Sequence, residues 1–252
     1  MARFLYHTGC PKCHSRDNLG IYDDGSSWCF GCSISSSPTI SPYVLEDEEE
    51  YLKPLPNDLT TEYSKQALDW TMKYDITPTD LLTRGACFSP GSNQLIFPSP
   101  SPRGIALTKE VLSKEKVFAC GRLLNPSNKQ RYTTYNQRLQ PFIYKADVPE
   151  GYGIRRGRGR TTLVMVEDCL SAIKVARQVD CMPLLTSTLP TKDLVAVAGL
   201  YDAFLIWLDG NMYHKAQKIA RKLQMLGKEA RAIYTKLDPK EYDNLTIQKI
   251  VL

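Results

Sequence analysis

The sequence of 252 residues lacks any run of 18 or more apolar residues, and it contains no internal repeat. A helix that crosses a membrane needs about 20 apolar residues in succession, so a membrane-spanning protein is excluded. The first residues, MARFLYHTGCPKC, also lack the apolar stretch of a secretory signal. These absences predict a cytoplasmic protein. In that reducing compartment the eight cysteines are not expected to form disulfides.

The composition changes along the chain and predicts four parts. Residues 1–32 are short and rich in cysteine. Residues 33–61 combine serine and proline with a run of acids, a composition that cannot bury a core and predicts a flexible acidic linker. Residues 62–160 contain apolar segments separated by turn residues, which predicts a basic α+β subdomain with a small sheet. Its predicted strands are 95–100, 104–108 and 117–124.

Strand and helix patterns alternate in the last part, residues 161–252. Strands are predicted at TTLVMV, CMPLL, AFLIWL and EARAIYT, and helices at DCLSAIKVARQV, PTKDLVAVAGL and MYHKAQKIARKLQML. The uniformly apolar strands are typical of a parallel sheet covered by helices on both faces. We therefore predict an α/β fold, preceded by the α+β subdomain and the cysteine-rich part.

Four cysteines follow the spacing C-x2-C-x15-C-x2-C: Cys10, Cys13, Cys29 and Cys32. This spacing is typical of one structural zinc ion held by four thiolates. The segment between the two pairs, LGIYDDGSSW, predicts a hairpin, and hence a small all-β zinc ribbon. So short a segment has too little apolar mass to fold alone, and the metal would supply its folding energy. The remaining cysteines lack ligand spacing and are predicted to be buried: Cys87, Cys120, Cys169 and Cys181.

Positive charge is concentrated in the middle of the chain. The net charge is +5, but residues 1–61 carry four Lys and Arg against nine acids, whereas residues 84–160 carry fourteen against four. A partner rich in phosphate would account for this concentration, because each neutralised phosphate releases a counterion. The alternative is an ordinary solvated surface.

Three acids follow three of the predicted strands: Glu167, Asp209 and Asp238. In a parallel sheet, ligands bind in the crevice at the carboxyl ends of the strands. Carboxylate oxygens gathered there would bind Mg²⁺, an ion that assists phosphoryl transfer. The alternative is that such acids cap the helices that follow, as Asp168 would.

In this order, the segments CPKC…DDGSSWCFGC and VMVEDCLSAI…FLIWLDGN…KLDPKEY resemble the DnaG-type primases, and in particular the primase half of bacteriophage primase–helicase proteins. The resemblance implies a zinc ribbon joined by a flexible linker to an RNA polymerase domain that contains a TOPRIM fold. It also implies that short RNA primers are made on single-stranded DNA from ribonucleoside triphosphates with Mg²⁺. Because the chain stops soon after Asp238, we expect a stand-alone, phage-encoded primase that works with a separate replicative helicase in a bacterial cell.

The resemblance further implies roles for individual residues. Glu167 matches the family's TOPRIM glutamate, Asp209 the first acid of its Asp-x-Asp motif, and Asp238 a later acid near the metal. These three would be catalytic and, together with Asn211, would bind Mg²⁺. The implied contacts with template and nucleotides come from the zinc hairpin and the basic middle of the chain: Asp24, Ser26, Trp28, Arg122, Lys129, Arg131, Arg155, Arg156, Arg158 and Arg160.

The sequence departs from the family pattern at several positions. Asp168 stands where glycine is usual, and Ser171 where a further acid often occurs. Asn211 replaces the second aspartate of Asp-x-Asp, so weaker metal binding is expected, since an amide oxygen brings no charge. Ser26 replaces the histidine of an Asp-Gly-His tip, which leaves Asp24 to read a template cytosine and predicts an altered template preference.

Two other functions fit parts of the sequence. A non-catalytic DNA-binding protein of the RecR recombination-mediator type also combines a cysteine zinc site with a TOPRIM domain, but a zinc motif followed by a long linker fits it worse. A TOPRIM nuclease would not need the basic α+β segment. Primer synthesis from labelled ribonucleotides on single-stranded DNA separates the three hypotheses.

Overall fold

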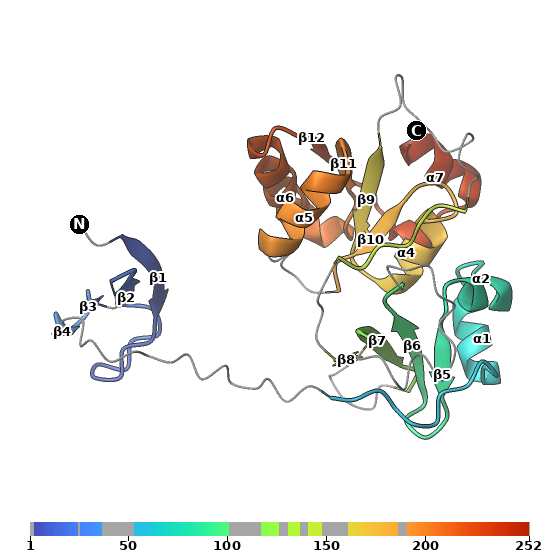
Figure 1. Cartoon of the computed structure of the whole chain (residues 1–252), viewed down its shortest axis with the longest axis horizontal. Coiled ribbons are helices and arrows are strands. Elements are labelled where there is room, and N and C mark those ends of the chain that lie inside the picture. Colours follow the sequence, from blue (N-terminus) through green and yellow to red (C-terminus); the bar gives the residue numbers. More distant parts are fainter. Residues whose placement is uncertain are drawn as a thin grey trace. The chain divides into compact units, whose positions relative to one another are not determined.

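The computed structural model describes residues 3–24, 26–36, 53–100, 117–125, 131–136, 141–147, 161–185 and 191–251. The chain divides into two compact units, Met1–Tyr51 and Leu52–Leu252 (Figure 1). Within the described ranges, the strands form three four-stranded sheets. No helix in these ranges is long and apolar enough to cross a membrane.

The first unit is an antiparallel sheet in the order β1-β2-β3-β4. Its strands are β1 (Phe4–Thr8), β2 (Leu19–Tyr22), β3 (Ser27–Cys29) and β4 (Ser35–Ser36). Strands β2 and β3 form the predicted hairpin. Among the described residues of this unit only Cys10, Gly20 and Cys29 are buried. So little buried apolar area cannot stabilise the fold on its own, which agrees with a structural role for a metal.

Both ends of the predicted linker, residues 33–61, belong to folded structure. At the first end, β4 pairs with β3. At the other end, the Asp58 carboxylate accepts hydrogen bonds from Ser89 Oγ at 2.7 Å and from the Gly91 backbone N at 2.6 Å. Composition did not reveal this contact, because the partners lie 31 and 33 residues further along the chain. The remainder of the predicted linker lies outside the described residues.

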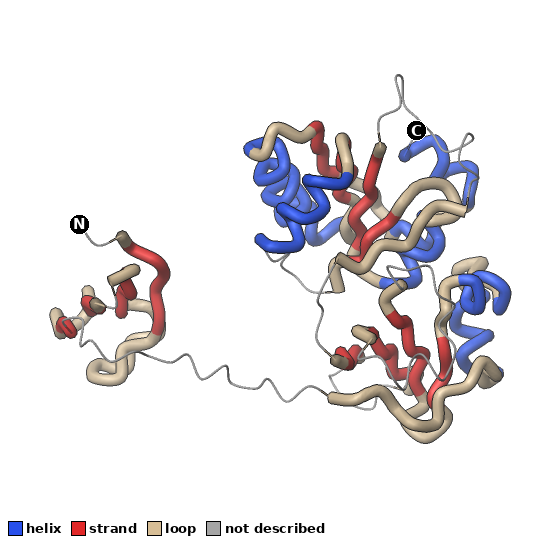
Figure 2. Tube along the Cα trace, in the orientation of Figure 1, coloured by secondary structure: helices blue, strands red, loops and turns tan. Residues whose placement is uncertain are grey.

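The second unit begins with two helices and an antiparallel sheet. Helices α1 (Lys65–Met72) and α2 (Pro78–Thr83) precede β5 (Cys87–Ser89), β6 (Gln94–Pro98), β7 (Ala119–Leu123) and β8 (Tyr132–Tyr135), which pair in that order. Helix α1 starts where the Ser64 side chain accepts a hydrogen bond from Ala67 N, and α2 starts at a capping box of Thr77 and Asp80. Both helices lie beside this sheet (Figure 2). The predicted strand at 104–108 lies outside the described residues.

The rest of the second unit is a parallel sheet in the order β10-β9-β11-β12. The strands are β9 (Thr162–Val166), β10 (Cys181–Pro183), β11 (Ala203–Ile206) and β12 (Glu229–Ala232), with helices α4 (Cys169–Val175), α5 (Thr191–Leu200), α6 (Tyr213–Met225) and α7 (Asn244–Val251). Short 3-10 helices η1 (Gly210–Met212) and η2 (Pro239–Glu241) follow β11 and β12. Figure 1 shows α5 and α6 on one side of the sheet and α4 and α7 on the other. The predicted α/β fold is confirmed.

Alternate residues of the central strand β9 enter opposite cores. Leu163 and Met165 of β9 pack with α5 and α6, whereas Val164 and Val166 pack with α4 and α7. The core that contains Val164 continues into the antiparallel half, where it includes Phe97 of β6. Because the second unit shares this continuous core, the antiparallel sheet is held in place next to the parallel one.

Candidate functional site

The four predicted zinc ligands of the first unit form a compact sulfur cluster. All four Sγ atoms lie within 4.8 Å of one another, with Cys10 3.7 Å from Cys32 and Cys13 3.7 Å from Cys29. A tetrahedron with zinc–sulfur bonds of about 2.3 Å places its sulfurs about 3.8 Å apart. The cluster could therefore bind one zinc ion. The other four cysteines are buried, as predicted.

The two Cys-x-x-Cys segments reach this geometry through the same turn. The Cys10 carbonyl accepts a hydrogen bond from His14 N at 2.9 Å, and the Cys29 carbonyl accepts one from Ser33 N at 2.8 Å. His14 and Ser33 both have positive φ angles, 55° and 54°. Residues other than glycine rarely adopt this conformation. The repeated turn directs both sulfurs of each pair into the cluster.

The hairpin residues predicted to contact the template lie in the same unit. Asp24 Oδ1 accepts a hydrogen bond from Ser26 N at 2.9 Å, which closes the turn. Hydrogen bonding from the Ser26 side chain, and then from this backbone N–H, lowers the pKa of Asp24. Trp28 in β3 is 41% exposed. The unit therefore presents a carboxylate and an aromatic ring to solvent on one hairpin.

The three predicted acids of the second unit line one cavity of about 430 Å³. Glu167 directly follows β9, Asp209 lies shortly after β11, and Asp238 precedes η2 in the segment after β12. Strands β9, β11 and β12 are parallel. Their carboxyl ends therefore meet at one edge of the sheet, as the sequence predicted.

Two carboxylate oxygens at this edge are buried and have no hydrogen-bond partner in the part of the chain that the structure describes. Among the described residues, neither Glu167 Oε2 nor Asp209 Oδ1 has a hydrogen bond. Burial and the neighbouring Asp168 and Asp238 carboxylates raise the pKa of Glu167. Burial, followed by repulsion from Glu167 and Asp238, raises the pKa of Asp209 to about 7. Since buried carboxylates need a counter-charge, these two residues fit a divalent cation such as Mg²⁺.

The acids are grouped less tightly than the cysteines. In the part of the chain that the structure describes, only the four cysteines bring three or more His, Cys, Asp or Glu ligand atoms within 4.8 Å of one another. Mg²⁺ usually keeps several waters and binds protein through one or two carboxylates. Glu167 and Asp209 can therefore hold it without a third direct ligand.

The other two acids of the cavity are bound by a lysine. Lys240 Nζ donates hydrogen bonds to Asp168 Oδ2 at 2.8 Å and to Asp238 Oδ2 at 2.9 Å. Asp168 also caps α4, because its Oδ1 accepts a hydrogen bond from Ser171 N at 3.0 Å. One oxygen of Asp238 thus binds a lysine, and the role of Asp238 as a metal ligand stays a prediction.

The structure does not bring Asn211 into this set. The chain enters η1 directly after Asp209, and Asn211 is exposed and is absent from the residues that line the cavity. Of the predicted basic residues, Arg122 and Arg131 line the cavity. The other predicted basic residues lie outside the described part of the chain: Lys129, Arg155, Arg156, Arg158 and Arg160.

Aromatic rings hold one of these arginines in place. The Arg122 guanidinium lies 4.7 Å from the centre of the Tyr132 ring and 5.3 Å from that of Trp70, distances at which cation–π attraction operates. Lys240 Nζ lies 5.7 Å from the ring centre of Tyr74. Sequence analysis missed these aromatic residues and Lys240, because their roles depend on contacts between distant segments. The one available signal was the place of Lys240 in the block KLDPKEY.

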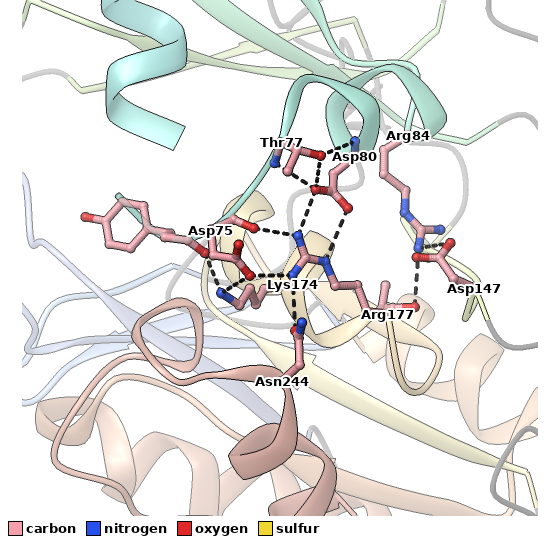
Figure 3. A network of polar contacts seen from close by, with 10 residues as sticks. Asp75, Thr77, Asp80, Arg84, Asp147, Lys174, Arg177 and Asn244 are labelled. Atoms are coloured by element: carbon pink, nitrogen blue, oxygen red, sulfur yellow. Dashed lines mark hydrogen bonds and ion pairs between the residues drawn. The ribbon is translucent and has the colours of Figure 1, made fainter. Parts of the chain in front are cut away.

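A charged network joins the segment after α1 to α4 and the residues that follow it (Figure 3). Arg177 binds Asp75 Oδ2 at 3.0 Å and Asp80 Oδ2 at 2.7 Å. Lys174, whose side chain is almost fully buried, donates a hydrogen bond to the Tyr74 carbonyl and pairs with Asp75 at 3.4 Å. Since Tyr74 lines the cavity and α4 begins at its acidic edge, the network fixes two walls of the cavity relative to each other.

Replacing Arg177 by alanine is expected to lower the free energy of unfolding of the second unit by about 3 kcal/mol, because it leaves the largely buried Asp80 carboxylate without its cation. The matched control is Lys65→Ala, which breaks an exposed pair with Asp69 and should change this free energy by less than about 1 kcal/mol. Urea unfolding followed by circular dichroism measures both variants. If both variants lost the same small amount of free energy of unfolding, the network would not stabilise the second unit as proposed.

Asp209 is expected to make the metal-free protein less stable as the pH rises from the pKa of Asp209 in the unfolded chain to its higher pKa in the folded protein. In the unfolded chain its carboxyl group loses a proton near the ordinary value of 3.8, but in the folded protein it keeps that proton up to about pH 7. The folded state therefore binds more protons in this interval, and the free energy of unfolding falls as the pH rises. The negative charges of Glu167 and Asp238 disfavour ionisation of Asp209, and the positive charge of Lys240 partly offsets this effect.

The variant Asp209→Asn removes this titration. The stability of the wild type minus that of the variant, measured in urea without divalent metal, should therefore decline between about pH 4 and pH 7. A difference that stays constant across this interval would show that Asp209 ionises normally.

Comparisons with known proteins bear on this geometry. No protein-family model and no curated protein sequence matches the chain. Among solved structures, the zinc-binding and RNA polymerase domains of the Aquifex aeolicus primase match at a TM-score of 0.56 with 15% identity, over 100% of this chain and 79% of theirs. The primase fragment of the bacteriophage T7 primase-helicase protein matches at a TM-score of 0.47 with 11% identity, over 98% of this chain and 97% of that fragment. The chain therefore has the fold of the two Aquifex primase domains, which is the DnaG-type fold that the sequence predicted.

Proposed function

We propose that this chain is a DNA primase, which joins ribonucleotides into short RNA primers on single-stranded DNA at the cavity of the second unit. One observation carries the proposal. Within the described residues, Glu167 and Asp209 place buried carboxylate oxygens without partners at the ends of two adjacent parallel strands. The fold shared with the Aquifex primase domains supports the same function.

Glu167 and Asp209 would hold Mg²⁺ at the acidic edge. When bound there, Mg²⁺ polarises phosphate oxygens and stabilises the pyrophosphate that leaves. The two residues have no competing hydrogen bond on these oxygens among the described residues, so both are available as ligands. Their raised pKa values also favour a cation, since its charge relieves the repulsion between them.

Arg122 and Arg131 would bind the triphosphate, since both line the cavity with their positive charge. Trp70 and Tyr132 restrict the Arg122 guanidinium, so less side-chain entropy is lost when it binds a phosphate. The 3′-oxygen of one ribonucleotide then bonds to the α-phosphorus of the next, and the bond from that phosphorus to pyrophosphate breaks. The hydroxyl proton passes to solvent.

The first unit would select the template. The Asp24 carboxylate can accept a hydrogen bond from a cytosine amino group, and the exposed ring of Trp28 can stack on a base. Ser26 lies between them on the hairpin. The basic residues outside the described ranges, Lys129 and the arginines between 155 and 160, would add phosphate contacts. A separate replicative helicase remains a predicted partner.

The proposal is tested by incubating the zinc-loaded protein with single-stranded DNA of random sequence, labelled ribonucleoside triphosphates and Mg²⁺. Gel electrophoresis should show short RNA products that require the DNA. DNA binding without RNA synthesis would instead support a recombination mediator, and cleavage of the DNA would support a nuclease. Either result would overturn the primase proposal.

A further inference from the structure

Lys240 binds two of the four acids that line the cavity. Its side chain comes from η2, is only 13% exposed, and donates hydrogen bonds to Asp168 and Asp238 at 2.8 and 2.9 Å. Burial by itself would lower the pKa of Lys240, but the two carboxylates outweigh burial and raise the pKa above its ordinary value. The ammonium group therefore places a positive charge between these two carboxylates.

The four carboxylates of the cavity thus divide into two pairs. Asp168 and Asp238 are bridged by Lys240, whereas Glu167 and Asp209 each keep a buried oxygen that has no hydrogen bond among the described residues. Many enzymes of phosphoryl transfer use two divalent cations about 4 Å apart. In this cavity the bridging ammonium group opposes a second cation, because its positive charge repels that cation and because it already binds one oxygen of Asp168 and one of Asp238.

We propose that Lys240 takes the place of a second divalent cation, so that the cavity binds one metal ion, at Glu167 and Asp209. The ammonium group has three N–H donors, and its hydrogen bonds to Asp168 and Asp238 use two of them. The third can reach a phosphate oxygen, since Lys240 itself lines the cavity. This last role rests on the proposed primase function, whereas the number of metal ions does not.

A purely structural role for Lys240 makes a different prediction. The ion pairs join η2 to the start of α4, so they could serve only to hold these segments together. In that case the number of divalent ions bound would not depend on the charge at position 240. Counting the ions therefore separates the two roles.

The test is a titration of the full-length, zinc-loaded protein with Mn²⁺, in which free Mn²⁺ is measured by electron paramagnetic resonance. The wild type should bind one Mn²⁺ per chain in addition to zinc, and Glu167→Gln should abolish that binding. Lys240→Gln should bind two, because the positive charge that opposes a second cation is then removed, whereas Lys240→Arg should still bind one. The control Lys145→Gln, which removes the charge of an exposed lysine paired with Asp180, should also bind one.

Two Mn²⁺ ions in the wild type, or one in a folded Lys240→Gln, would overturn the proposal. If Lys240→Gln does not fold, the variant Asp238→Asn is titrated with Mn²⁺ instead. It should still bind one Mn²⁺ with near-normal affinity, because Asp238 binds the lysine and not the metal. A loss of Mn²⁺ binding in Asp238→Asn would overturn the assignment. One bound Mn²⁺ in a protein that makes no RNA would contradict the primase function alone and leave the role of Lys240 supported.

Discussion

Asparagine in place of Asp209 is expected to slow primer synthesis by on the order of a thousandfold. The substitution keeps the shape of the side chain but removes the charge of a carboxylate that, among the described residues, has a buried oxygen without a hydrogen bond. A bound metal contributes several kcal/mol to the stabilisation of transferring phosphate, and about 1.4 kcal/mol corresponds to a factor of ten in rate. Binding of single-stranded DNA should persist, because Asp209 does not belong to the basic residues proposed to contact it.

The matched control for this variant is Asp202→Asn. Asp202 directly precedes the same strand, β11, and accepts hydrogen bonds from Thr161 N and Oγ1 at 3.0 Å. Its replacement alters a carboxylate at the opposite end of the sheet and should leave the rate of primer synthesis near that of the wild type. Similar rate losses in the two variants would show that the loss reflects stability rather than metal binding.

Serine in place of Cys29 is expected to abolish zinc binding and to unfold the first unit. Cys29 is fully buried, and among the described residues of this unit only Cys10 and Gly20 are buried with it. Structural zinc supplies about 10–16 kcal/mol to small zinc domains, far more than so small a core can replace. NMR spectra should show the first unit unfolded and the second unit folded, and elemental analysis should find no zinc.

Cys87→Ala is the control for the zinc prediction. Cys87 is also buried but lies in β5 of the second unit and does not belong to the sulfur cluster. This variant should retain one zinc ion per chain and a folded first unit. A folded first unit in metal-free Cys29→Ser would contradict the structural role of the metal.

The sequence predicts the parts of the site that depend on local patterns. Cysteine spacing identifies the sulfur cluster, because each Cys-x-x-Cys turn is complete within a few residues. The positions of Glu167 and Asp209 follow from the rule that parallel strands point their carboxyl ends to one edge. Only the order of strands and the acids after them are needed for that prediction.

Contacts between distant segments could not be predicted in this way. The cation–π pair of Trp70 and Arg122 joins α1 to β7, and the Lys240 bridge joins η2 to Asp168, 72 residues earlier in the chain. Asn211 was predicted to bind metal because of its place in a motif. The turn into η1 leaves it exposed, and the local sequence does not signal that turn.

The most direct test of the central claim is a crystal structure of the protein with Mn²⁺ and a ribonucleoside triphosphate that cannot react, recorded at the manganese absorption edge. The anomalous signal should show one Mn²⁺ in the cavity, about 2.1 Å from carboxylate oxygens of Glu167 and Asp209, with the triphosphate bound to it. A triphosphate bound elsewhere, or an ion held by Asp168 and Asp238 instead, would contradict the assignment of this cavity as the site of nucleotidyl transfer.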